Sequence, residues 1–350
     1  MFLSYRREYM ANVSEADFQH FVSSPFFNPK LGWDNPTEAM KMKRTNSVGH
    51  LVEYNYANGY RVTPGVEDGH ASVALFGESY AQGEEVPDDA TIAAVLTRKY
   101  KLPTVNYGVN AYGPLQAVEK FEGLSEQQRS FHTAVLLIMH ENVWRIVNSF
   151  KPVYSSFKSD FYFGLKPFVQ DGRIVLLDYP TKYPDFLAEA QRRFESDYWT
   201  KPERSFPYSI SLIKALQTHT FVSLMKNFFP GTFDYEYNHN PDTISALRVV
   251  LDEFVKSAEA VHIRPVIIFI PRHKESYLKS EKFVDSMNAR WHQTLAYEFQ
   301  DDQMDWNAYK LSKWRVKSHP SEYGYERLAD FVHKVLQPTS PEAPTNRIEK

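Results

Sequence analysis

A serine flanked by glycines follows a short apolar run, and this arrangement can present a nucleophile. Residues 72–76 form a mainly apolar run that ends at Gly77, which is typical of a strand covered on both faces. Gly77 and Gly83 allow a tight turn with free backbone N–H groups around Ser79. A hydroxyl between such a strand and a following helix suits attack on an ester, with backbone donors to hold the oxyanion. The same glycines and serine also fit a turn that serves steric needs only.

Three later segments supply the other groups that such chemistry needs. Residues 104–106 form an expected strand that leads into a glycine-rich turn at 107–113. Residues 134–139 form a strongly apolar strand that ends shortly before Asn142. His319 stands just before an amphipathic helical pattern. The four sites together offer a nucleophile, oxyanion donors and a general base, which is the set required for acyl transfer through a serine ester.

These segments resemble, in order, the conserved blocks of the SGNH (GDSL-type) hydrolase superfamily, especially its larger bacterial members, some of which acylate or deacylate polysaccharides. The matching residues are Gly77-Glu78-Ser79 with Gly83, Asn106-Tyr107-Gly108 with Tyr112-Gly113, Asn142, and His319-Pro320 with Gly324. The resemblance covers roughly residues 70–150 and 245–336. It implies an α/β fold with a doubly wound, mostly parallel sheet of the SGNH or flavodoxin-like kind.

The resemblance also implies a role for each matched residue. Ser79 would attack the ester and His319 would take its proton. The N–H groups of Ser79 and Ala111 would hold the oxyanion together with the Asn142 amide. No cofactor and no metal are expected, and the implied partner is a small-molecule or glycan ester.

Three positions depart from the family pattern. Glu78 stands where the family has Asp, and Ala111 stands where it usually has Gly. A backbone N–H survives the change to Ala if the local dihedral angles accept a Cβ. The family's Asp three residues before its His is replaced by Val316, so another group must orient His319. The candidates are a backbone carbonyl, which would make a Ser-His dyad, and the carboxylates of Asp301, Asp302 and Asp305.

Polar residues near the expected strand ends are candidates for substrate binding. Glu78 and His140 are expected to line the pocket, and Arg145 could hold an anionic substrate group or cap the sheet edge. His140-Glu141 resembles the start of a zinc-binding helix, but the position four residues after His140 is Trp144. We therefore expect no metal there.

Composition narrows the class of protein. The 350 residues carry 40 Lys plus Arg against 43 Asp plus Glu, a net charge of −3, and no basic stripe that would indicate nucleic-acid binding. The absence of cysteine excludes disulfides and thiol catalysis. No run is long enough for a transmembrane segment, and the N-terminus lacks the apolar core of a signal peptide. The expectation is a cytoplasmic protein if Met1 is the true start, and a periplasmic or exported one if an upstream signal or anchor is missing.

The expected organisation has three parts. Residues 1–70 form an N-terminal extension, with a hairpin at Asn58-Gly59. Residues 71–336 form the SGNH-like α/β domain, which is interrupted by a mixed insertion at 151–243. Residues 337–350 form a disordered tail. Further expected elements are a hairpin at Asp171-Gly172 and helices at 15–22, 184–198, 210–228, 244–260 and about 276–299.

Two functions are compatible with the sequence. The first is a serine-dependent ester hydrolase or O-acyltransferase that acts on an acylated carbohydrate. The alternative is a catalytically idle SGNH-like domain that binds glycan or serves as a scaffold, which Glu78 and Val316 favour. Retention of Ser79, Asn142 and His319 together favours the enzyme.

Overall fold

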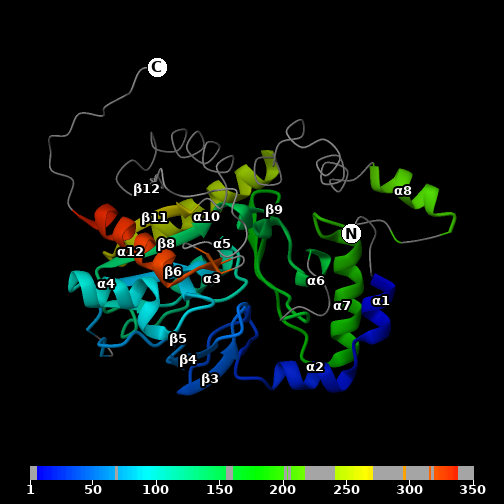
Figure 1. Cartoon of the computed structure of the whole chain (residues 1–350). Helices are drawn as coiled ribbons and strands as arrows, with labels where there is room; N and C mark the ends of the chain where they lie inside the picture. Colours follow the sequence, from blue (N-terminus) through cyan, green and yellow to red (C-terminus); the bar gives the residue numbers. More distant parts are fainter. Residues whose placement is uncertain are drawn as a thin grey trace.

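The computed structural model describes residues 6–67, 70–154, 161–200, 203, 206–216, 241–270, 295–296, 315–316 and 319–337. Its centre is an eight-stranded sheet in which five parallel strands are extended at one edge by three antiparallel ones (Figure 1). Across the sheet the strands are β12 (Leu295–Ala296), β11 (Arg264–Ile270), β8 (Thr133–Met139), β6 (Val73–Gly77), β7 (Thr104–Asn106), β5 (Tyr60–Arg61), β4 (Leu51–Ala57) and β3 (Met40–Thr45).

The parallel strands are apolar throughout because helices cover both faces. Alternate residues of β6, β8 and β11 point to opposite sides, so Leu75 and Leu137 enter one hydrophobic cluster while Phe76 and Leu136 enter the other. The first face packs against α4 (Ile92–Tyr100) and α12 (Glu322–Leu336), and the second against α5 (Pro114–Glu122) and α10 (Pro241–Ala260). The sequence-based prediction of a doubly wound, mostly parallel α/β sheet is confirmed.

The strand order places a topological switch point at β6. The chain runs from β6 to β7 on one side and then to β8 on the other, as in flavodoxin-like sheets. In open α/β sheets, ligands bind outside the carboxyl ends of the strands at such a point. The region after β6 and β8 is therefore where a site is expected.

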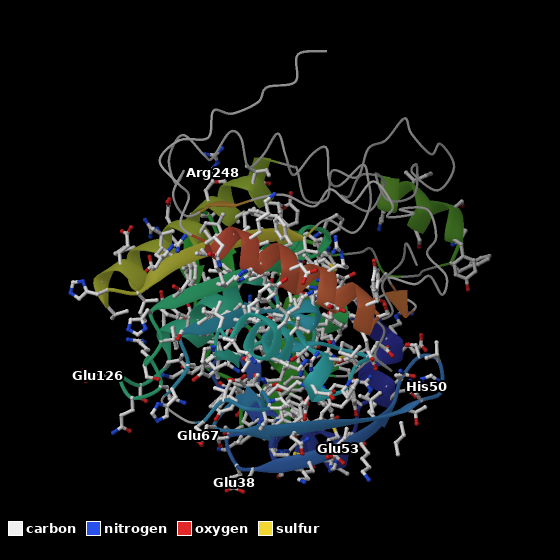
Figure 2. All side chains as sticks on the ribbon, turned by 60° about the vertical axis from the view of Figure 1, so that its left-hand side comes forward. Glu38, His50, Glu53, Glu67, Glu126 and Arg248 are labelled. Carbon is white, nitrogen blue, oxygen red and sulfur yellow. The ribbon has the colours of Figure 1, made fainter. Side chains whose placement is uncertain are left out.

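The antiparallel edge comes from the N-terminal region. β4 and β5 form the predicted hairpin, and Asn58 and Gly59 both adopt positive φ in its turn. β3 is the edge strand of the sheet. Its exposed Lys41 and Lys43 disfavour pairing with a strand of another molecule. Charged side chains such as Glu53 lie along this edge (Figure 2).

A second group of elements lies beside the sheet (Figure 1). It joins N-terminal helices to the segment after residue 150 through an aromatic core in which Phe18, Phe163 and Phe186 are fully buried. Its elements are α1 (Arg6–Asn12), α2 (Glu15–Val22), the short pair β1 (Phe27–Asn28) and β2 (Gly32–Trp33), α6 (Lys151–Tyr154), the hairpin β9 (Phe168–Gln170) and β10 (Arg173–Val175), and α7 (Tyr183–Ser196).

Two of the helix predictions change. The helix expected at about 276–299 is wrong at its end, because Leu295–Ala296 is a strand that pairs in parallel with Ile267 and Ile268. The helix expected at 210–228 is described as α8, Tyr208–Leu216, and its remainder lies outside the described residues. The predicted tail lies outside them too, apart from Gln337. Among the described residues, no helix has both the length and the apolar composition to span a bilayer.

Candidate active site

Ser79 and His319 meet at the carboxyl edge of the sheet. Ser79 is the first residue of the short helix α3 (Ser79–Gln82), which begins after β6 and Glu78. His319 lies on β14 (His319–Pro320), immediately before the Ser321 cap of α12. The His319 Nε2 atom is 3.0 Å from the Ser79 Oγ atom, although the two residues are 240 positions apart. A histidine at this distance can remove the serine proton during attack.

The glycines around the serine are required by close packing. Gly77 has φ +146°, and a Cβ there would lie 2.4 Å from the Leu137 carbonyl oxygen. A Cβ on Gly108 would lie 2.3 Å from the Gln82 nitrogen. Both glycines therefore meet a steric need, which leaves a catalytic role of the turn open. Gly77 lets the end of β6 lie against the β8 backbone, and Gly108 lets the loop after β7 lie against the backbone of α3.

Asn142 supplies a buried amide beside this turn. It lies on the 3-10 helix η2 (His140–Val147), which directly follows β8, the neighbour of β6. Only 4% of the residue is exposed, and its Nδ2 atom has no hydrogen-bond partner within the described part of the chain. A buried donor without an acceptor is uncommon and costly, so this N–H is available to an acceptor that binds beside the turn.

Ala111 lies in the loop between β7 and α5. Its φ is +64°, a left-handed conformation that a residue with a Cβ adopts at a cost of about 1–2 kcal/mol. A glycine at this position would carry no such cost. The backbone accepts Ala, and the N–H that was predicted as an oxyanion donor is retained.

Hydrogen bonds to the N-terminal segment hold this loop in place. None of these contacts was predicted from the sequence. Trp33 Nε1 donates to the Asn110 carbonyl at 2.9 Å, and Asn35 Nδ2 donates to the Gly108 carbonyl at 2.9 Å. In return the Tyr112 hydroxyl donates to the Trp33 carbonyl at 2.8 Å. These bonds fix the loop on both sides of Ala111. No local pattern in the sequence indicates them, because the partners are more than 70 residues apart.

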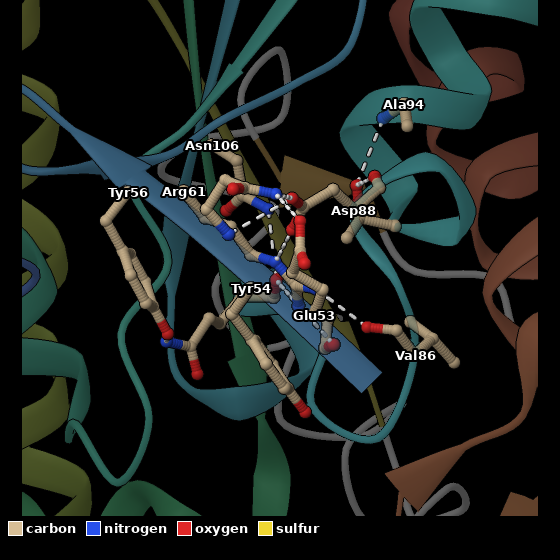
Figure 3. A network of polar contacts seen from close by, with 12 residues as sticks. Glu53, Tyr54, Tyr56, Arg61, Val86, Asp88, Ala94 and Asn106 are labelled. Carbon is tan, nitrogen blue, oxygen red and sulfur yellow. Dashed lines mark hydrogen bonds and ion pairs between the residues drawn. The ribbon is translucent and has the colours of Figure 1, made fainter. Parts of the chain in front are cut away.

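Arg61 holds the chain that follows α3. Its guanidinium is fully buried and donates to the Gln82, Gly83 and Val86 carbonyls at 3.1, 2.6 and 2.7 Å. It also pairs with Asp88 at 2.6 Å, as Figure 3 shows. Arg61 thus ties the antiparallel edge to the segment that carries the serine. This role was also missed from sequence, where Arg61 is only one residue of a hairpin strand.

The predicted substrate-binding residues have different surroundings. Glu78 is buried, and its Oε1 accepts from the Met139 N–H at 2.7 Å, which ties the ends of β6 and β8 together. Arg145 Nη1 donates to the Tyr112 carbonyl at 2.7 Å, on the loop that contains Ala111. The His140 backbone begins η2, and its side chain lies outside the described part.

A buried lysine and a buried aspartate hold the end of η2 through hydrogen bonds to the backbone. Lys166 Nζ donates to the carbonyls of Arg145, at 2.6 Å, and of Asn148. Asp197 accepts from the backbone N–H groups of Ser149 and Phe150, at 3.0 and 2.7 Å. Burial lowers the pKa of Lys166 to about 7 and raises the pKa of Asp197 to about 6, and each group offsets part of the other's shift. The pair fixes the end of the helix that carries Asn142.

Most of the groups predicted to orient His319 lie outside the described residues. Val316 pairs with His319 in the two-strand ladder of β13 (Arg315–Val316) and β14, so its backbone lies directly beside the histidine. Asp301, Asp302 and Asp305 lie outside the described residues. A backbone carbonyl or one of these carboxylates stays the prediction. In the described ranges, no group of three or more His, Asp or Glu side chains is arranged to hold a metal ion.

Comparisons with known proteins add little to this geometry. No family model matches the chain. No curated protein matches it. Among solved structures it is similar to a protein from Desulfitobacterium hafniense DCB-2 assigned to the lipolytic G-D-S-L family, with 11% identity and a TM-score of 0.39 over 75% of this chain and 98% of that chain. A likeness of this size does not bear on function, and the α/β fold is stated from the strand order and the helix layers.

Proposed function

We propose that the protein is a serine-dependent ester hydrolase or O-acyltransferase that acts on an acylated carbohydrate. The observation that carries the proposal is the 3.0 Å contact between Ser79 Oγ and His319 Nε2, beside the unpartnered amide of Asn142. These groups converge from the ends of β6 and β8 and from the start of α12, at the switch point of the sheet. A structural role for the three residues gives no reason to leave the amide without an acceptor.

The proposed reaction has two steps. Ser79 Oγ attacks the ester carbonyl carbon while His319 Nε2 takes its proton. The oxyanion is held by the Ser79 N–H, which has no partner within α3 at its first position, by the Ala111 N–H and by the Asn142 amide. His319 then protonates the leaving alcohol, which leaves an acyl group on Ser79. In the second step water or an acceptor hydroxyl attacks this acyl-enzyme, His319 takes the new proton, and Ser79 is restored.

An idle glycan-binding or scaffold domain is the second candidate. Two observations favour it: Glu78 is engaged in a structural hydrogen bond, and the position three residues before His319 holds Val316, whose side chain cannot accept a hydrogen bond. A carboxylate at that position normally stabilises the imidazolium formed during attack. Without one the same residues would support slow turnover or none.

Labelling with a fluorophosphonate separates the two candidates without knowledge of the substrate. We expect the purified protein to be modified on Ser79, identified by mass spectrometry of the labelled peptide. Ser79→Ala should abolish labelling and lower turnover by several orders of magnitude. Ser125→Ala, at an exposed serine, is the matched control and should label like the unsubstituted protein. Folded protein that stays unlabelled for hours contradicts the enzyme and favours the idle domain.

A further inference from the structure

A cavity of about 470 Å³ lies beside the candidate active site, on the side of the antiparallel edge. It is bounded by the end of α3, by β3 and β4, by the loop after β7 and by the segment at 161–162. Gln82, in its wall, ends the four-residue helix that Ser79 begins, so the two Cα atoms are about 4.5 Å apart along the helix axis. Asn110, also in its wall, precedes Ala111. The cavity thus borders the end of the helix that Ser79 begins and the loop that carries Ala111.

Gln82 shows that the cavity is built for a polar ligand. The residue is 3% exposed, and its Nε2 donates to the Tyr56 hydroxyl at 3.2 Å and to Asn35 Oδ1 at 3.4 Å. Its Oε1 has no hydrogen-bond partner among the described residues. A buried acceptor without a donor destabilises the folded state, and a ligand hydroxyl would supply the donor.

The other walls restrict the ligand further. Phe26, Phe161 and Tyr162 contribute partly exposed aromatic rings, which pack well against C–H groups. The Glu84 carboxylate also lines the cavity, and it pairs with Arg44 at 2.9 Å, so the wall has no surplus positive charge. An anionic ligand is therefore disfavoured. An acyl chain is disfavoured too, because it would seal the Gln82 oxygen against hydrocarbon.

We propose that this cavity is a subsite for one uncharged pyranose ring of the ester substrate, with a ring hydroxyl that donates to Gln82 Oε1. A pyranose has apolar C–H faces for the aromatic walls and hydroxyls for the amide and carboxylate. The volume falls within the range of small-molecule pockets. The proposal rests on the proposed function, since the ring is placed as part of the ester that Ser79 attacks.

The test compares two kinds of ester that share one acyl group. The kcat/KM values are measured for p-nitrophenyl acetate, which has no sugar, and for mono-acetylated methyl glucopyranoside, galactopyranoside and mannopyranoside. Their ratio reports the subsite, and the absolute rates report the chemistry. We expect at least one acetylated pyranoside to be hydrolysed, and its kcat/KM relative to that of p-nitrophenyl acetate, compared between variants, is the preference. We expect Gln82→Leu, similar in volume but without the acceptor, to lower that preference about tenfold.

A second variant tests the subsite independently, in case Gln82→Leu does not fold. Met42→Trp fills the cavity from β3 without removing a hydrogen bond, and it should lower the same preference. Lys41→Ala, exposed on the same strand, is the control and should leave the preference unchanged.

Each outcome separates the two proposals. If Ser79 is not labelled by the fluorophosphonate, the proposed function fails. If Ser79 is labelled but neither Gln82→Leu nor Met42→Trp changes the preference, the subsite proposal alone is wrong. If Gln82→Leu instead raises the rate for p-nitrophenyl octanoate relative to the acetate, the cavity holds the acyl chain and the sugar assignment is overturned.

Discussion

Replacement of Asn142 by leucine should lower activity and preserve stability, an unusual combination for a buried polar residue. The loss of one oxyanion donor costs about 100- to 1,000-fold in kcat, or about 2.7–4 kcal/mol. The free energy of unfolding should respond differently. The Asn142 Nδ2 atom is buried and has no partner in the described residues, so the folded state carries a desolvation cost of about 1–3 kcal/mol. Asn142→Leu removes that cost and keeps most of the volume, so stability should be unchanged or higher.

Asn148 is the matched control on the same part of the chain. It is also fully buried, but its Nδ2 donates to the Trp144 carbonyl at 3.1 Å and its Oδ1 accepts from the Trp199 N–H at 2.9 Å. Asn148→Leu would remove both of these hydrogen bonds. We expect it to lower the free energy of unfolding by about 2 kcal/mol or more, with a smaller effect on kcat than Asn142→Leu.

The assay combines turnover of p-nitrophenyl acetate with urea unfolding of each variant. KM for Asn142→Leu should stay close to the unsubstituted value, because the lost interaction belongs to the transition state. The reasoning is refuted if Asn142→Leu keeps full kcat. It is also refuted if Asn142→Leu is destabilised as strongly as Asn148→Leu, because the amide would then have a structural partner.

Two further predictions follow from backbone strain and from burial. Ala111→Gly should keep the oxyanion N–H and relieve the strain at φ +64°. We therefore expect kcat to change less than about threefold and urea unfolding to show no loss of stability. A large loss of kcat would mean that the Ala111 methyl group itself contacts substrate. Burial, with Glu122 and Glu253 nearby, raises the pKa of Glu119 to about 7, so stability should fall as pH rises from about 4.5 to 7 and stay lower above that range. Glu119→Gln should therefore stabilise the protein by on the order of 1 kcal/mol at pH 8, after allowance for solvent screening, and hardly at pH 4. The exposed Glu126 (Figure 2) provides the control Glu126→Gln, and equal effects of Glu119→Gln at both pH values would contradict the assignment.

The order of elements in the main sheet could be predicted because its signals are local. The strands after residues 72 and 132 are short apolar runs, and amphipathic periodicity indicates α10 and α12. Because β6 and β8 are apolar along nearly their whole length, burial of both their faces could also be expected. The predicted helix at 276–299 failed at Leu295–Ala296, where pairing with β11 outweighs a local helical pattern.

The candidate site also has a part that could be predicted from sequence and a part that only the fold determines. Ser79, Asn142 and His319 could be named as candidates from sequence, since each follows or precedes an element with a clear pattern. Only the tertiary structure brings Ser79 Oγ and His319 Nε2 to 3.0 Å, because no pattern encodes a contact across 240 residues.

Several other features of the site depend on contacts between segments that are far apart in the sequence. The antiparallel strands within residues 40–61 join the central sheet. Hydrogen bonds from Trp33 and Arg61 hold the two loops of the site. Asn142 and Gln82 each keep an amide atom that no described residue contacts through a hydrogen bond. Residue type alone determines what a side chain can donate or accept. Whether a hydrogen-bond partner is present depends on which distant segments the fold packs together. The sequence therefore determined which donors, acceptors and nucleophiles this protein has. The tertiary structure decided which of them lie together and which buried groups have no partner among the described residues.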